Sequence, residues 1–211
     1  MNGSPRRRPR GVRRLLGVCV LAISVTSASC TVLAPRADPS RFFVLTPLAD
    51  AAPSSGGERV ASLGLGPIHL PRYLDRPEIV TRVGPNEVKP ALFDYWGGSL
   101  TRQFETVLAQ NLQTLVHADR IQLYPWYAGA APTLVVEVDV QRFEPSSDGR
   151  VELAARWRVR KGSGLDTLRA GESTFSRPLS GGDSEAAAVA LSGLLEDFSR
   201  ELAEVILAVR A

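Results

Sequence analysis

The side chains on which catalysis or metal binding could be built are scarce in this chain. Its 211 residues include two histidines and two cysteines, too few for a Cys/His metal cluster. His69 stands between apolar neighbours in a strand-like run and His117 ends a helical pattern, so we interpret both as structural. Gly162-Ser163-Gly164 lies in a turn between strands and lacks the spacing of a nucleophile elbow. We therefore expect no catalytic residue, no metal and no cofactor.

Three arginines occupy alternate positions of one strand-like run: Arg156, Arg158 and Arg160. Guanidinium groups on one strand face could bind phosphate headgroups or an acidic protein surface. The alternative is cross-strand pairing with Glu137 and Asp139 of the preceding run, and this is the interpretation we favour. The arginine row is kept as a weak candidate for binding anionic groups.

Residues 1–29 have the pattern of an export signal. Six arginines and no acid lie within residues 1–14, an uncharged run of about eleven residues follows, and small residues fill positions 26–29. Cys30 comes next, so the segment resembles a bacterial lipoprotein signal, in which the cysteine thiol is acylated before cleavage. Ser27 stands where lipoproteins usually have Leu. An uncleaved anchor helix is the alternative, but the small and hydroxylated residues of 24–31 would make a poor hydrocarbon segment.

Cleavage before Cys30 changes the charge balance of the chain. The precursor has 25 basic and 22 acidic residues, a net charge of +3. Removing the six leader arginines leaves 19 basic residues against 22 acidic ones, a net charge of −3 for the mature chain. The basicity belongs to the leader, so we expect no nucleic-acid partner.

The residue after Cys30 is Thr31 rather than Asp. The resemblance to bacterial lipoproteins then implies sorting to the outer membrane, with the protein lipid-anchored on the periplasmic face. Lipoproteins of this class carry several acyl chains, and stable anchoring takes more than one. Residues 30–40 become a lipidated tether, of which ten extended residues reach about 33 Å.

Residues 41–211 carry the patterns of one α+β domain. Residues 133–143 and 151–159 alternate apolar and charged side chains, which predicts an antiparallel hairpin with one buried face. Further strand-like runs lie at 41–46, 60–70, 78–83, 121–124 and 168–176. Apolar residues at helical spacing predict two amphipathic helices, one from Trp96 to Val116 with Ser99 as a cap, and one that closes the chain. We predict a two-layer sandwich, with one mixed or antiparallel sheet of about six strands and two helices on one face.

One stretch is more specific than these patterns: residues 66–82 read GPIHLPRYLDRPEIVTR. It closely resembles the GPV-x-LP-x-YLDRP-x-IVTR signature of the ABC-type transport auxiliary lipoproteins, the PqiC family of intermembrane transport lipoproteins. The leader, the strand at 41–45, the Ala-Arg-Trp-Arg run at 155–158 and the closing helix are also similar, so the resemblance covers essentially residues 30–210. Family members often have Trp-Ala-Glu-Pro-Leu at the start of the first helix. Here residues 96–100 read WGGSL, so no role of that Glu is carried over.

The resemblance implies a non-enzymatic accessory protein. Such lipoproteins accompany MCE-domain proteins and an associated inner-membrane transporter, which move lipids or other apolar molecules between membranes. This chain would dock the end of the conduit at the outer membrane. A structural or assembly lipoprotein for an outer-membrane protein is the alternative function, and a homo-oligomer is left open.

Our candidate contact surface for that partner is the Pro-bounded segment Pro71-Arg72-Tyr73-Leu74-Asp75-Arg76-Pro77, because Tyr and Arg are enriched at interfaces. The alternative is that Tyr73 and Leu74 pack onto the sheet edge while Asp75 and Arg76 form a local ion pair. The residues alone leave both interpretations open.

Overall fold

The computed structural model describes residues 37–49, 60–126, 131–162, 164 and 166–210. The chain divides into two compact units, Met1–Pro39 and Ser40–Ala211. The leader, Cys30 and most of the tether lie outside the described residues, so the signal and the anchor stay predictions. The second unit holds β1 (Arg41–Phe43), β2 (Leu63–His69), the 3-10 turn η2 (Arg72–Leu74), β3 (Glu78–Gly84), β4 (Glu87–Trp96), α2 (Leu100–Val116), β5 (Ile121–Leu123), β6 (Leu134–Ser146), β7 (Arg150–Lys161), β8 (Thr167–Pro178) and α3 (Ser184–Arg210).

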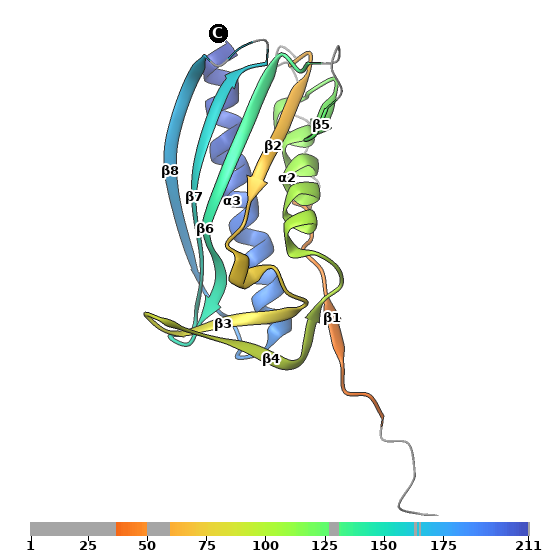
Figure 1. Ribbon diagram of the computed structural model, residues 1–211, viewed down its shortest axis with the longest axis vertical. Coiled ribbons are helices and arrows are strands. Elements are labelled where there is room, and N and C mark those ends of the chain that lie inside the picture. Colours follow the sequence, from red (N-terminus) through yellow and green to blue (C-terminus); the bar gives the residue numbers. More distant parts are fainter. Residues whose placement is uncertain (1–36, 50–59, 127–130, 163, 165, 211) are drawn as a thin grey trace, which may run out of the picture. The chain divides into compact units, whose positions relative to one another are not determined.

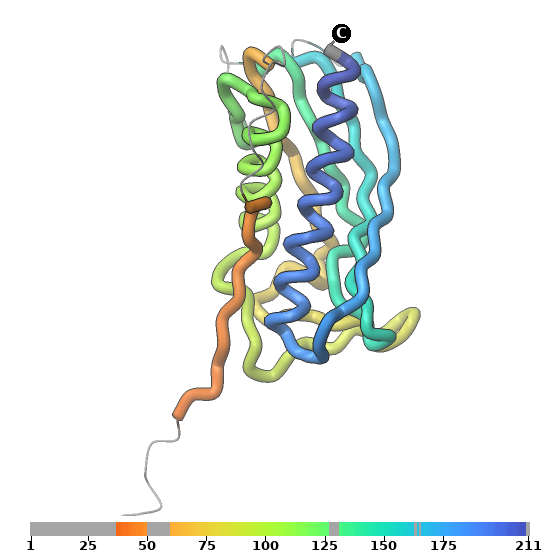
Figure 2. Tube along the Cα trace, turned by 180° about the vertical axis from the view of Figure 1, so that it is seen from behind, coloured from red at the N-terminus to blue at the C-terminus, as the bar shows by residue number. Residues whose placement is uncertain are grey.

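Within the described residues, eight strands form one mixed sheet, and both helices lie on the same face of it (Figures 1 and 2). Strand β6 is central: antiparallel β7 runs along one of its edges, and parallel β2 and the end of β3 pair with the other. Strand β8 continues the sheet beyond β7, β5 beyond β2, and β4 and β1 beyond β3. The predicted two-layer α+β sandwich is confirmed, with eight strands in place of about six.

The strand that the sequence does not predict is β4. Its apolar residues do not alternate, Pro90 interrupts them, and several of its side chains are exposed, so the usual strand pattern is absent. The prediction that Trp96 opens the first helix is wrong, because Trp96 ends β4 with 5% of its surface exposed. Helix α2 begins only after Gly97 and Gly98, where the hydroxyl of Ser99 accepts the N–H of Arg102 at 3.4 Å, the predicted cap.

The core fills the space between the sheet and the helices with large apolar side chains. Phe104 of α2, Phe143 of β6 and Phe198 of α3 are each at most 1% exposed. The ring of Phe104 meets that of Phe143 edge to face, with centroids 5.1 Å apart, and lies 6.5 Å from that of Phe198. Phe104 of α2 therefore contacts both the central strand β6 and the other helix, α3.

The segment after β1 is fastened to the two helices through its backbone. The N–H groups of Leu45, Thr46 and Leu48 donate to Gln103 Oε1 (2.9 Å), Ser192 Oγ (3.1 Å) and Asn111 Oδ1 (2.9 Å). Figure 2 shows this orange segment running beside α2. Because α2 and α3 supply all three acceptors, these hydrogen bonds fix residues 45–48 to the helical layer.

Of these three acceptors, Asn111 of α2 is fully buried, and its replacement is expected to lower the stability measurably. Its Nδ2 also donates to Ser199 Oγ of α3 at 3.0 Å, so the amide joins three segments. Asn111→Ala should lower the free energy of unfolding by about 1–3 kcal/mol, because it leaves the Leu48 N–H and the Ser199 hydroxyl without this partner. Urea unfolding measures it. Gln110→Ala, at the exposed neighbouring position, should change stability by less than about 0.5 kcal/mol.

Candidate functional site

The signature segment 66–82 leads the chain from β2, around η2 and into β3. The Gly66–Pro67 peptide bond is cis, and the pairing of β2 with β6 shifts register between Leu65 and Ile68. Pro71 to Leu74 closes the turn through the Leu74 N–H, which donates to the Pro71 carbonyl at 2.9 Å. The segment then returns along β3, whose Arg82 pairs in register with Ser146 at the end of β6.

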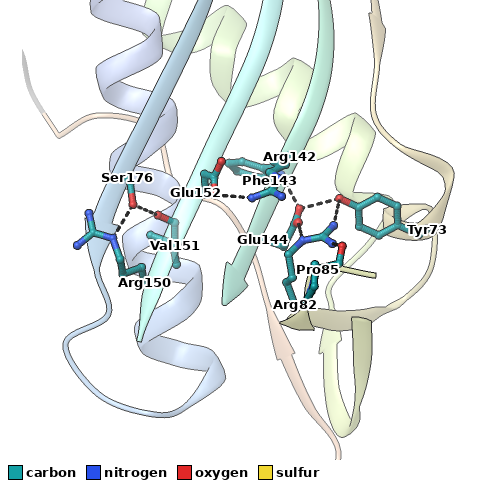
Figure 3. A network of polar contacts seen from close by, with 10 residues as sticks. All are labelled: Tyr73, Arg82, Pro85, Arg142, Phe143, Glu144, Arg150, Val151, Glu152 and Ser176. Atoms are coloured by element: carbon teal, nitrogen blue, oxygen red, sulfur yellow. Dashed lines mark hydrogen bonds and ion pairs between the residues drawn. The ribbon is translucent and has the colours of Figure 1, made fainter. Parts of the chain in front are cut away.

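Two residues of the signature converge on a buried carboxylate of β6 (Figure 3). The Tyr73 hydroxyl donates to Glu144 Oε2 at 3.0 Å, and Arg82 Nε donates to Glu144 Oε1 at 2.8 Å. Arg82 Nη2 also donates to the Tyr73 hydroxyl at 3.1 Å, so the three groups close a ring of contacts. The side chains of Glu144 and Arg82 are 2% and 17% exposed. We call Tyr73, Arg82 and Glu144 the Glu144 cluster.

The Glu144 cluster fixes η2 and β3 against β6. Glu144 lies on the strand face opposite Phe143, where η2 and β3 cover it, and the Phe143 N–H donates to its Oε2 at 2.8 Å. The hydrogen bond to the Glu144 carboxylate raises the pKa of Arg82, so that guanidinium is held charged. Burial, with the Glu144 charge added, raises the pKa of Tyr73 to about 12. The phenol is thus held neutral as a donor.

The raised Tyr73 pKa predicts a stability loss in strong alkali. The group binds its proton more tightly in the folded state, from a reference of 10.0 to about 12. Its contribution is therefore complete below pH 10 and disappears as the pH rises through about 12. Absorbance titration of the four tyrosines should show one late phenol that is missing from Tyr73→Phe. Unchanged late titration in that variant would contradict the assignment.

The candidate contact segment 71–77 has an inner and an outer side. Leu74 is 3% exposed and joins the core, and Tyr73 belongs to the Glu144 cluster, as the packing alternative expects. Arg72, Asp75, Arg76 and Pro77 are exposed. The ion pair of Arg76 is with Glu78, at 3.0 Å, and not with Asp75. The outer side therefore presents two arginines, one acid and one proline around a turn whose inner side is fixed.

The arginine row lies on the sheet face away from the helices and meets carboxylates. Arg158 and Arg160 both reach Glu137 of β6, at 2.9 Å and 2.7 Å, and Arg156 reaches Glu172 of β8 at 2.7 Å. The favoured interpretation is cross-strand pairing of these arginines with Glu137 and Asp139. Pairing with Glu137 is present, whereas Arg156 pairs with Glu172 instead of Asp139. A hollow of about 570 Å³ lies over the same strands, and its charged lining includes Asp139 and Glu172 beside Arg156 and Arg158.

Among the described residues, the histidines and acids do not gather into a metal-binding group. His69 is exposed at the end of β2, and His117 follows α2 as its left-handed C-cap, with φ 49°. Among these residues, no three His, Cys, Asp or Glu side chains form a group that could hold a metal ion. Nor does any helix in the described ranges have the length and apolar composition needed to cross a membrane.

Sequence reasoning singled out Tyr73 but missed the two residues that bind it. Arg82 ends the signature, nine positions after Tyr73, and Glu144 lies in a strand where its neighbours Phe143 and Pro145 are also buried. The only sequence signal for Glu144 is an acidic residue between the apolar Phe143 and Pro145. Nothing in the sequence shows that β3 would pair with the end of β6 and cover it.

Fold and signature together define a class of lipoprotein domain. The model of one family, the ABC-type transport auxiliary lipoprotein component, matches residues 43–203. The chain belongs to this family, which confirms the resemblance seen in residues 66–82. It is a transport auxiliary component by family, and no curated protein matches it.

Solved structures share the fold at low identity. A DUF330-family protein from Xanthomonas campestris superposes with a TM-score of 0.67 and 19% identity, covering 81% of this chain and 96% of its own. Another crystal structure, of an uncharacterized protein, gives 0.64 and 16% identity, covering 79% of this chain and 98% of that one. At these identities the similarity shows the fold alone.

Proposed function

We propose that this protein is an outer-membrane lipoprotein that acts as a non-enzymatic accessory subunit of an MCE/ABC-type intermembrane lipid transport system. The observation that carries the proposal is the family match over residues 43–203, joined to a leader that ends just before Cys30. The acyl chains on Cys30 hold the domain at the membrane, which raises its effective concentration for a partner that reaches the same surface. Its task is to receive the end of the MCE conduit there.

The outer side of segment 71–77 is the surface we assign to this partner. Interfaces favour Arg and rigid, pre-formed turns, because less conformational freedom is lost on binding. Arg72, Asp75 and Arg76 are exposed, while Leu74 and the Glu144 cluster hold the turn from behind. Changing Arg72 and Arg76 therefore leaves these buried contacts in place and removes the exposed ion pair of Arg76 with Glu78.

The anchor is tested by replacing its attachment point. Wild-type protein should label with palmitate and fractionate with the outer membrane, whereas Cys30→Ala should lose the label and leave the membrane fraction. Stable attachment takes more than one acyl chain, so loss of all of them should release the domain. Membrane association of Cys30→Ala at the wild-type level would overturn the anchor.

Docking is tested by co-purification with the MCE-domain partner from cells. A variant that combines Arg72→Glu with Arg76→Glu should reduce recovery of the partner at least about tenfold, since like charges across an interface are strongly unfavourable. A matched control, Arg102→Glu with Arg200→Glu, changes two arginines that are 66% and 50% exposed on the helices. Equal recovery from both double variants would contradict docking through segment 71–77.

A further inference from the structure

Large apolar side chains gather at the corner of the sheet formed by β1 and β4. Phe42 is 69% exposed, Leu92 77% and Phe93 50%. The ring of Phe42 stacks on that of Tyr95, with centroids 5.6 Å apart, in the register that pairs the two residues across the strands. We call Phe42, Leu92, Phe93 and Tyr95 the aromatic corner. Single exposed apolar residues are ordinary, but a contiguous group marks a surface that is covered in use.

The corner lies at an irregularity of strand β4. The pairing of β3 with β4 shifts register between Glu78 and Val80, so residues 91–94 bulge from the ladder, and there Leu92 and Phe93 are exposed. Beside them, the Asp94 carboxylate is taken up by Arg41, through bonds of 2.8 Å and 3.0 Å, and by the Ser184 hydroxyl at 2.7 Å. Protruding apolar side chains, with the nearest carboxylate paired, suit insertion into an apolar medium.

The corner also lies where the chain from the anchor joins the folded unit. Strand β1 begins at Arg41, eleven positions after Cys30, so an extended connection spans at most about 40 Å. Ser184, which contacts Asp94, opens helix α3, and the C-terminal end of that helix lies at the opposite end of the unit (Figure 1). The membrane anchor and the aromatic corner are thus connected to the same end of the domain.

We propose that the aromatic corner inserts into the interfacial layer of the membrane that holds the acylated Cys30, as a second contact that orients the domain. This rests on the lipid anchor of the proposed function. Aromatic rings and Leu partition into the headgroup region. Lys89, exposed earlier on β4, can extend its ammonium to the lipid phosphates. The acyl chains supply attachment, and the corner sets which side of the domain faces the periplasm.

The test places an environment-sensitive dye at the corner of the mature lipidated protein. Leader cleavage removes Cys19 and acylation blocks Cys30, so Leu92→Cys offers a single thiol for a nitrobenzoxadiazole label. The control is Leu207→Cys, a 41%-exposed residue near the C-terminal end of α3. Both proteins are reconstituted on vesicles of phosphatidylethanolamine and phosphatidylglycerol, with or without lipid carrying a quencher at the headgroup level.

We expect the label at position 92 to brighten at least about twofold on the vesicles and to be quenched by the modified lipid, while position 207 stays in water. Adding Phe42→Ser and Phe93→Ser should return the label at 92 to water, although the protein still floats with the vesicles. Flotation with position 92 in water from the start would overturn the oriented insertion alone. Failure to float would overturn the anchor, and this proposal with it.

Discussion

Arg82→Ala is expected to lower the free energy of unfolding by about 3–5 kcal/mol, because it leaves the buried Glu144 carboxylate without its cation. Glu144 is 2% exposed, and its remaining side-chain partner is the hydroxyl of Tyr73. The loss should exceed that of any surface ion pair in the domain, and urea unfolding measures it. Refolding yield should fall as well, since η2 and β3 lose the contact that fixes them to β6.

The control for this variant is Arg142, which lies on β6 two residues before Glu144. Arg142 pairs with Glu152 at 2.8 Å, but both side chains are about one-third exposed or more, so Arg142→Ala should cost only about 0–1 kcal/mol (Figure 3). The paired change Arg82→Met with Glu144→Leu should cost less than Arg82→Ala, because no uncompensated charge remains. Equal costs for Arg82→Ala and Arg142→Ala would show that the Glu144 cluster does not hold the signature segment.

Phe104→Ala is the second change with a large expected effect, a loss of about 3–5 kcal/mol in the free energy of unfolding. The side chain is fully buried and touches Phe143 and Phe198 at once, so its removal opens a cavity that neither helix can close alone. Chemical denaturation followed by fluorescence of the three tryptophans reports the shift in midpoint.

Phe93→Ala is the matched control for the core variant, since it removes the same side chain from an exposed strand position. Phe93 is half exposed at the aromatic corner, and its loss should cost less than about 1 kcal/mol. A comparable loss from both variants would mean that burial between the helices and the sheet is not what stabilises the domain.

Most of the fold follows from hydrophobic periodicity. The β6–β7 hairpin, both helices and the Ser99 cap are predicted because each has one apolar face and a local start or stop signal. Strand β4 is missed because it lies at a corner of the sheet, with few inward side chains, so no alternation is imposed on it. Trp96 fits the helical spacing and still ends a strand, because Gly97 and Gly98 separate it from helix α2.

The candidate site is predicted only as a segment. Residues 71–77 are recognised from the family signature, and the structure then separates them by partner: Tyr73 and Leu74 face inward, and the charged residues face out. That division depends on Glu144, which lies 71 positions from Tyr73. Pairing over such a distance is set by sheet topology, and local sequence patterns contain no information on it.

The most direct test of the central claim is photo-crosslinking in cells from position 72. A photoreactive amino acid replaces Arg72, on the outer side of segment 71–77, and a second strain carries it at the exposed Gln110 of α2 as the control. The docking account predicts that position 72 captures the MCE-domain protein and that position 110 does not. Capture of an outer-membrane protein from position 72, with no MCE-domain protein among the products, would contradict the account and favour an assembly role.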